Sequence, residues 1–63
     1  MNRDQILALI RTFARSQGCW GRLLRDLYIL EENDPETFDS LMTEWEGMNF
    51  QSDLDCLLFL EGN

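Results

Sequence analysis

The sequence predicts an all-α fold, a small three-to-four-helix bundle in a single domain over residues 1–63. Apolar residues recur at helical spacing along most of the chain. The segments that they define are separated by short stretches containing Gly, Asn or Ser, which interrupt helices. With 63 residues, of which 44% are hydrophobic, the chain can form one core.

The first expected helix runs from about residue 3 to residue 15. Asn2 can cap it, because a side-chain oxygen at this position accepts a hydrogen bond from the first turn. Its apolar face consists of Ile6, Leu9, Ile10 and Phe13. The stretch 16–18 ends this helix, and we expect Gly18 to adopt the left-handed conformation there.

The second expected helix spans about residues 19–32 and is apolar around much of its circumference. Such a helix belongs at the centre of a bundle. Its charges oppose the helix dipole, because Arg22 lies near the start while Glu31 and Glu32 lie at the end. We expect it to pack antiparallel to the next helix, so that Glu44 and Glu46 lie opposite Arg22 and compensate its charge.

The third expected helix spans about residues 35–46 and begins at a strong signal, the sequence Asp34-Pro35-Glu36. Its inner stripe is formed by Phe38, Leu41, Met42 and Trp45. The fourth expected helix, about residues 53–61, is capped by Ser52 and is too short to form without tertiary packing. Phe50, in the preceding loop, is expected to fill the core.

These patterns together predict a set of core residues. The expected members are Ile6, Leu9, Ile10, Phe13, Leu24, Leu27, Leu41, Met42, Trp45, Leu57 and Leu58.

Charge is distributed unevenly along the chain, whose net charge is -7. All 5 basic residues are arginines that precede Asp26, whereas Asp4 alone of the 12 acids does so. We expect an acidic surface where the second helix ends and the third begins, and repulsion there should raise carboxyl pKa values. Its members are Glu31, Glu32, Asp34, Glu36 and Asp39.

The residues that most enzymes use are missing, so we expect neither catalysis nor a cofactor. Without His and Lys, the usual general bases and Schiff-base nucleophiles are absent. Cys19 and Cys56 have no His to activate them and do not form a C-x-x-C motif, so buried core thiols are expected. Two Cys cannot form a zinc site alone, and residues 31–39 lack EF-hand spacing.

The N-terminal stretch is neither a signal peptide nor a membrane span, because Asp4, Arg11 and Arg15 interrupt it. We therefore expect a cytoplasmic protein with reduced thiols and no membrane partner.

The apolar surplus predicts a binding surface, because a small bundle cannot enclose every large side chain of the second and fourth helices. We expect an exposed patch that includes Trp20, Tyr28 or Phe59 and is rimmed by arginines. The rim consists of Arg11, Arg15, Arg22 and Arg25. Alternatively, these arginines pair within the chain with Asp26, Glu44 and Glu46.

The predicted function is that of a small acidic protein-interaction module, an accessory or inhibitory factor. Its partner would be another protein or, in a homodimer, a second copy of the chain. One alternative is a DNA mimic, in which carboxylates occupy the phosphate-binding groove of a nucleic-acid-handling protein.

Another alternative is a helix-turn-helix regulator. Ala14, Gly18 and Leu24 fit the spacing of that motif, with Arg22 and Arg25 in its second helix. Gln17, Gly21 and the net charge of -7 argue against it, so nucleic acid is not the expected partner.

Three stretches carry a resemblance: SQGCWGRLLRDL at residues 16–27, Asn33-Asp34-Pro35-Glu36, and Asn49-Phe50. With them the chain resembles short, uncharacterised acidic helical proteins encoded by mobile elements and phages of gut bacteria. The resemblance implies a bacterial cytoplasmic protein. Small accessory proteins of such elements often bind host or element proteins, including as inhibitors of defence systems. The resemblance implies no particular site residues.

Overall fold

The computed structural model describes residues 1–62, apart from the side chain of Cys19, so the expected burial of that thiol lies outside the described part. It contains α1 (Arg3–Ala14), α2 (Cys19–Asn33), α3 (Pro35–Gly47) and α4 (Asp53–Glu61), with no strand in the described residues. The predicted all-α fold is therefore confirmed, and each helix ends within one residue of the expected position.

Side chains cap three of the helices, as the sequence predicts. Asn2 and Gln5 form a reciprocal capping box at the start of α1, with both hydrogen bonds 2.9 Å long. At the start of α3, the Asp34 carboxylate accepts hydrogen bonds from the backbone N–H and the hydroxyl of Thr37. Ser52 accepts a hydrogen bond from the backbone N–H of Asp55 at the start of α4.

The expected left-handed conformation of Gly18 is wrong. Gly18 has φ -76° and is the residue from which α2 begins, whereas α1 has already ended at Arg15 in a right-handed conformation. The turn is closed instead by a hydrogen bond from the Ser16 N–H to the Phe13 carbonyl. Among residues 1–62, Asn49 is the one residue with a left-handed φ, at 52°.

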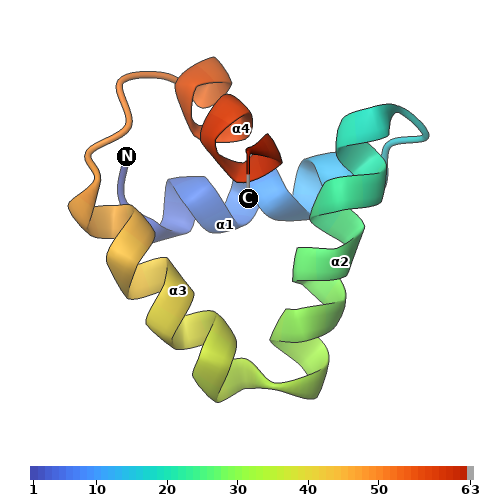
Figure 1. Cartoon of the computed structure of the whole chain (residues 1–63), viewed down its shortest axis with the longest axis horizontal. Helices are drawn as coiled ribbons and strands as arrows, with labels where there is room; N and C mark the ends of the chain where they lie inside the picture. Colours follow the sequence, from blue (N-terminus) through green and yellow to red (C-terminus); the bar gives the residue numbers. More distant parts are fainter. Residues whose placement is uncertain (63) are drawn as a thin grey trace.

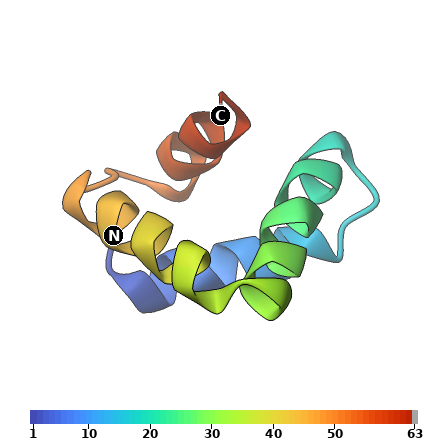
Figure 2. The ribbon, with the colours of Figure 1, turned by 60° about the horizontal axis from the view of Figure 1, so that its bottom comes forward.

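Three helices form the sides of a triangle and the fourth lies over it. Figure 1 shows α1, α2 and α3 as these sides, and Figure 2 shows α4 on one face of the layer. The Cα atoms span 28 × 26 × 19 Å. The smallest dimension fits two helical layers, because packed helices lie about 8–10 Å apart.

The expected antiparallel packing of α2 and α3 is wrong. Asp34 is both the last cap of α2 and the first cap of α3, so a single residue connects the helices. Such a connection makes a corner, because antiparallel helices need a loop of about 2–5 residues. The predicted pairing of Arg22 with Glu44 and Glu46 is absent from the described residues for the same reason.

Ion pairs instead connect α1 to the other sides of the triangle. Arg3 pairs with Asp39 of α3, and Arg11 pairs with Glu31 of α2 at 3.1 Å. Both pairs are partly exposed, so each contributes at most about 1 kcal/mol to stability.

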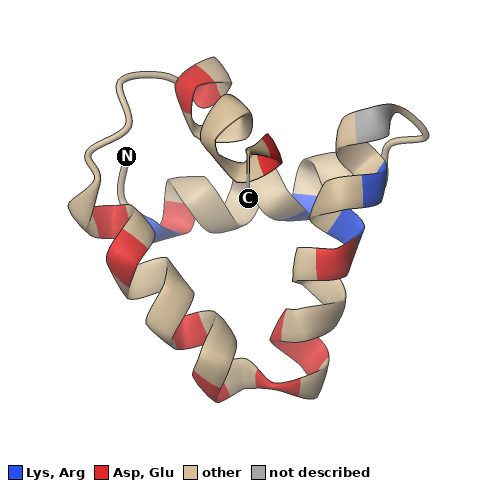
Figure 3. Cartoon of the chain, in the orientation of Figure 1, with Lys and Arg blue, Asp and Glu red and all other residues tan. Residues whose placement is uncertain are grey.

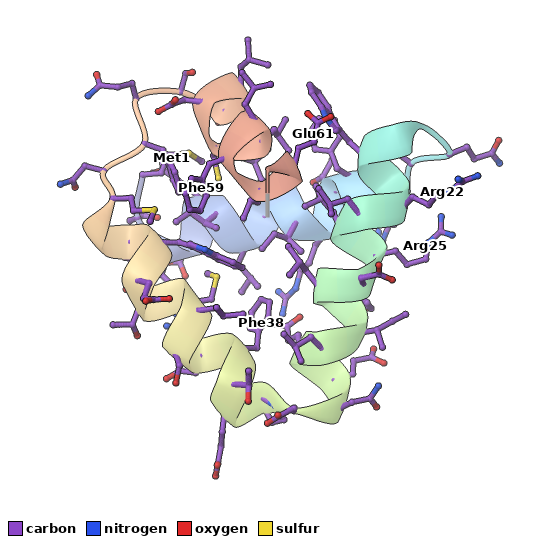
Figure 4. All side chains as sticks on the ribbon, in the orientation of Figure 1. Met1, Arg22, Arg25, Phe38, Phe59 and Glu61 are labelled. Carbon is purple, nitrogen blue, oxygen red and sulfur yellow. The ribbon has the colours of Figure 1, made fainter. Side chains whose placement is uncertain are left out.

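The core fills the space between the triangle and α4. Figure 4 shows Phe38 pointing into the middle of the triangle, and Phe50 is buried as predicted. The buried hydrophobic residues are Ile6, Leu9, Ile10, Ala14, Leu24, Phe38, Met42, Trp45, Phe50, Cys56, Leu57 and Leu60.

The expected core differs from this set at a few positions. Phe13, Leu27 and Leu41 are only partly buried. The prediction that Leu58 is a core residue is wrong, because its side chain is 53% exposed. α4 is apolar around most of its circumference, so its sequence does not reveal which side faces inward. In the structure, Cys56, Leu57 and Leu60 take that side.

The close crossing of α1 and α2 depends on Gly21, which lies in the first turn of α2 and is buried. A Cβ atom at this position would stand 2.0 Å from the carbonyl oxygen of Ser16. The sequence suggests only that Gly21 weakens its helix. In the structure, the absence of a side chain at Gly21 allows α2 to pack closely against the end of α1.

No helix within residues 1–62 combines the length and the apolar composition that crossing a bilayer requires.

Candidate functional site

Two of the four arginines expected at a partner-binding rim make contacts within the chain. Arg11 donates to Glu31. The Arg25 guanidinium donates to the carbonyl oxygens of Ala14 and Ser16, at 3.5 and 3.4 Å. These carbonyls lie at the C-terminal end of α1, where a cation is favourable. Intrachain pairing is therefore partly correct, but its acceptors differ from those predicted.

Arg15 and Arg22 remain on the surface. Both are exposed, and neither forms an ion pair within the described residues. Figure 4 shows Arg22 and Arg25 on the outer side of α2, and Figure 3 shows basic residues near the corner between α1 and α2 as well as at the start of α1, beside α3. Of the four arginines of the expected rim, Arg15 and Arg22 are thus exposed without an ion pair in the described residues, whereas Arg11 and Arg25 have acceptors within the chain.

The three aromatic residues expected in the patch are half-buried and pack against the core. The ring of Trp20 meets Phe13 edge-on, with centroids 5.9 Å apart, and its Nε1–H donates to Glu61 at 3.2 Å. Phe59 packs on Phe50 at 5.4 Å. These two rings and that of Tyr28 therefore pack, at least in part, against the core of the monomer.

The most exposed large apolar side chains are others. Leu54 is 55% exposed and Leu58 is 53% exposed, ahead of Met48 at 48% and Ile29 at 46%. Leu54 and Leu58 are four residues apart on α4 and therefore share one side of it. We call this pair the leucine face. The uninterrupted apolar run at 56–60 hides it in the sequence, because Leu58 looks like a core residue.

An open groove of about 350 Å³ adjoins α4. Its lining residues come from α1 and from the first residue of α4: Gln5, Ala8, Leu9, Thr12, Phe13 and Asp53. Among its lining residues Asp53 alone belongs to α4, and neither Leu54 nor Leu58 lines the groove. The groove therefore lies at the start of the same helix that carries the leucine face, the helix whose apolar surplus the sequence singled out.

The acidic surface lies where predicted, around the corner between α2 and α3 (Figure 3). Its members are less repulsive than expected, because Glu31 and Asp39 are paired with arginines. The expected rise in carboxyl pKa is wrong for Asp34. Its pKa is lowered from 3.8, first by the hydrogen bond from the Thr37 hydroxyl and then by that from the Thr37 N–H.

Cys56 is a free thiol with no exposed surface. Burial, followed by the charge of Asp53, raises its pKa from 9.0 to about 11. Since the thiolate is the reactive form, Cys56 is a poor nucleophile at neutral pH. Among the described residues, no three His, Cys, Asp or Glu side chains are grouped as a metal site would require.

Comparison of the chain with models of protein families, with curated proteins and with solved structures gives no match, so the arrangement of α4 and its groove is the basis for a functional proposal.

Proposed function

We propose that the chain is a protein-interaction module whose binding surface is the leucine face of α4 together with the adjoining groove. The observation that carries this proposal is the exposure of Leu54 and Leu58, one helical turn apart and both more than half accessible. Burying a leucine side chain stabilises a protein by about 1.5–3 kcal/mol. Two adjacent leucines that the fold leaves outside thus offer binding energy to a partner.

The fold itself does not require these two side chains. Cys56, Leu57 and Leu60 already supply the buried side of α4. Contiguous exposed apolar surface beside a concave region is typical of interaction sites, whereas scattered exposed leucines are ordinary. The groove supports the proposal because it is a concave region at the start of the same helix, lined by Leu9 and Phe13, that partner side chains can enter.

In this proposal the module acts by binding to its partner, as an accessory or inhibitory factor, and catalyses no reaction. The partner is another protein or a second copy of the chain. The proposal places the protein in the cytoplasm, where a free thiol such as Cys56 stays reduced.

The experiment is site-specific photo-crosslinking in bacterial cells that express the chain. A photoreactive amino acid replaces Leu58 in one variant and Ile29, a comparably exposed apolar residue of α2, in the control. We expect a discrete crosslinked product from position 58 and none from position 29. A product containing two copies of the chain identifies a homodimer. Equal labelling at both positions, or no product at position 58, contradicts the proposal.

A DNA-mimicking inhibitor is the second candidate. It is favoured by Glu32 and Glu36, which are exposed and form no ion pair within the described part of the chain. A partner bound through mimicry would be displaced by duplex DNA and lost in a Glu32→Gln/Glu36→Gln variant. For a module that binds through α4, neither treatment releases the partner. A DNA-shift assay tests the helix-turn-helix alternative, in which the chain itself retards duplex DNA.

A further inference from the structure

We propose that the partner of the α4 surface presents a basic amphipathic helix, with apolar side chains along one side and Lys or Arg along its edges. This inference rests on the proposed function and adds the chemistry of the partner to it. It depends on the shape of the apolar surface and on the charges that surround it.

The charged side chains of α4 have one sign. α4 carries Asp53, Asp55 and Glu61 and no basic residue. Asp53 lines the groove itself, and Asp55 and Glu61 flank the leucines along the helix. From Asp26 to the end of the sequence there is no basic residue at all.

The Met1 ammonium donates to the Phe50 carbonyl at 3.1 Å and acts on Cys56, which belongs to the buried side of α4 and not to the leucine face. The arginines in the second half of α1 and just after it do not offset the acids of α4 either. Arg11 is occupied by Glu31, and Arg15 lies beyond Phe13, the last residue of α1 that lines the groove. An acidic partner would therefore meet uncompensated repulsion along α4, whereas a basic partner would gain attraction along both edges of the apolar surface.

The apolar surface favours a helix over an extended strand. No β-sheet edge exists within residues 1–62 to which a strand could add. Leu54 and Leu58 lie one turn apart along α4, the spacing at which one side of an amphipathic helix packs against another helix, and the groove lies at the start of α4. A volume of about 350 Å³ is at the lower end for ligand pockets and suits a few partner side chains.

Two synthetic probes test the inference. Both are helical peptides of about 18 residues with leucines at the same i, i+3, i+4 and i+7 positions. One carries Lys and Arg at the remaining positions, and the other carries Glu. Fluorescence anisotropy at about physiological salt measures binding to the full chain and to four of its variants.

We expect the basic peptide to bind at least about tenfold more tightly than the acidic peptide. Leu54→Ser/Leu58→Ser should weaken its binding about tenfold, whereas Ile29→Ser should leave it unchanged. Asp53→Asn should weaken binding severalfold, whereas Glu44→Gln, the same loss of charge on the exposed side of α3, should have little effect. Circular dichroism confirms that each variant is folded.

Binding that responds equally to the α4 variants and to their controls would overturn the inference, because the attraction would then be one of net charge alone. Failure of the inference is distinguishable from failure of the proposed function. If Leu58 crosslinks to a partner in cells but the basic peptide does not bind, the interaction surface stands and the proposed partner chemistry falls.

Discussion

At Gly21 the backbone of α2 lies very close to the backbone of the turn that follows α1. Ala would improve the helix propensity of α2 by about 1 kcal/mol. Its Cβ, however, would stand 2.0 Å from the Ser16 carbonyl oxygen, a backbone atom that can move only with the turn. The crossing of α1 and α2 is therefore more sensitive to one added methyl group than to ordinary changes of helix propensity.

We expect Gly21→Ala to reduce the free energy of unfolding by roughly 1–3 kcal/mol, the usual cost of overpacking. Gly47→Ala is the matched control, because it is also helical and its Cβ would have no neighbour within 4 Å. It should be neutral or stabilising by up to about 1 kcal/mol. Urea unfolding of both variants measures the difference, and equal effects would mean that the crossing tolerates a side chain.

Asp34 gives the protein a defined sensitivity to acid. Its pKa is lower in the folded chain than the ordinary value of 3.8, because Thr37 donates two hydrogen bonds to the carboxylate. The stabilisation is therefore present above pH 3.8 and is lost as the pH falls through the folded pKa. Mild acidification from pH 7 to 5 leaves this cap intact.

Thermal melts between pH 7 and pH 2 test this expectation. The melting temperature of the wild type should decline faster below about pH 4 than that of Asp34→Asn, because Asn can cap a helix without titrating. Parallel curves for the two proteins in this range would show that the cap does not prefer the ionised carboxylate.

Cys56 gives a second pH dependence, of the opposite sense. Because its pKa is raised to about 11, the unfolded chain loses the thiol proton at lower pH than the folded chain does. Stability should fall between about pH 9 and 11, by at most about 2–3 kcal/mol. Denaturation of wild type and Cys56→Ala at pH 8 and 10.5 measures this, and the variant should lack that part of the fall. An identical fall in both would assign it to other groups.

Among the helices, α4 is the one whose orientation decides whether the proposed binding surface exists. Leu57 and Leu58 are adjacent and chemically identical, yet the first is 4% exposed and the second 53%. Their difference in burial follows only from the direction in which α4 packs. The same direction sets which leucines remain available to a partner.

Alanine substitutions of these neighbours should have very different effects. Leu57→Ala should cost roughly 2–5 kcal/mol, enough to unfold much of so small a domain. Leu58→Ala should change stability by no more than about 0.5 kcal/mol. Chemical denaturation decides the point, and a reversed order of the two variants would mean that α4 packs through its other side.

For the molecule as a whole, we expect repulsion among the acids to affect the free energy of unfolding more than the ion pairs do. The chain has a net charge of -7, and the described residues contain the pairs Arg3–Asp39 and Arg11–Glu31. Both pairs are partly exposed and contribute little. Screening should therefore remove more repulsion between the acids than attraction within the pairs.

We accordingly expect the melting temperature to rise when sodium chloride is increased from about 10 to 200 mM, a range over which the Debye length falls from about 30 to below 10 Å. Differential scanning calorimetry at pH 7 measures the change. A fall in melting temperature would indicate that the ion pairs around α1 dominate. Sedimentation equilibrium at both salt concentrations shows whether association accompanies the change.

Features that depend only on neighbouring residues could be predicted from the amino-acid sequence. Asn2, Asp34 and Ser52 identified the helix starts because a cap acts within one turn. Helical periodicity identified most of the core, and counting charges located the acidic corner.

Other features could be seen only in the folded chain: the side of α4 that faces inward, the angle between α2 and α3, and the acceptors of the arginines. The apolar run of α4 has no preferred side, so Leu58 became exposed only when Cys56, Leu57 and Leu60 met the core. Likewise, the role of Gly21 depends on the path of the Ser16 backbone. These features depend on how whole helices pack against one another in three dimensions, which composition and spacing do not encode.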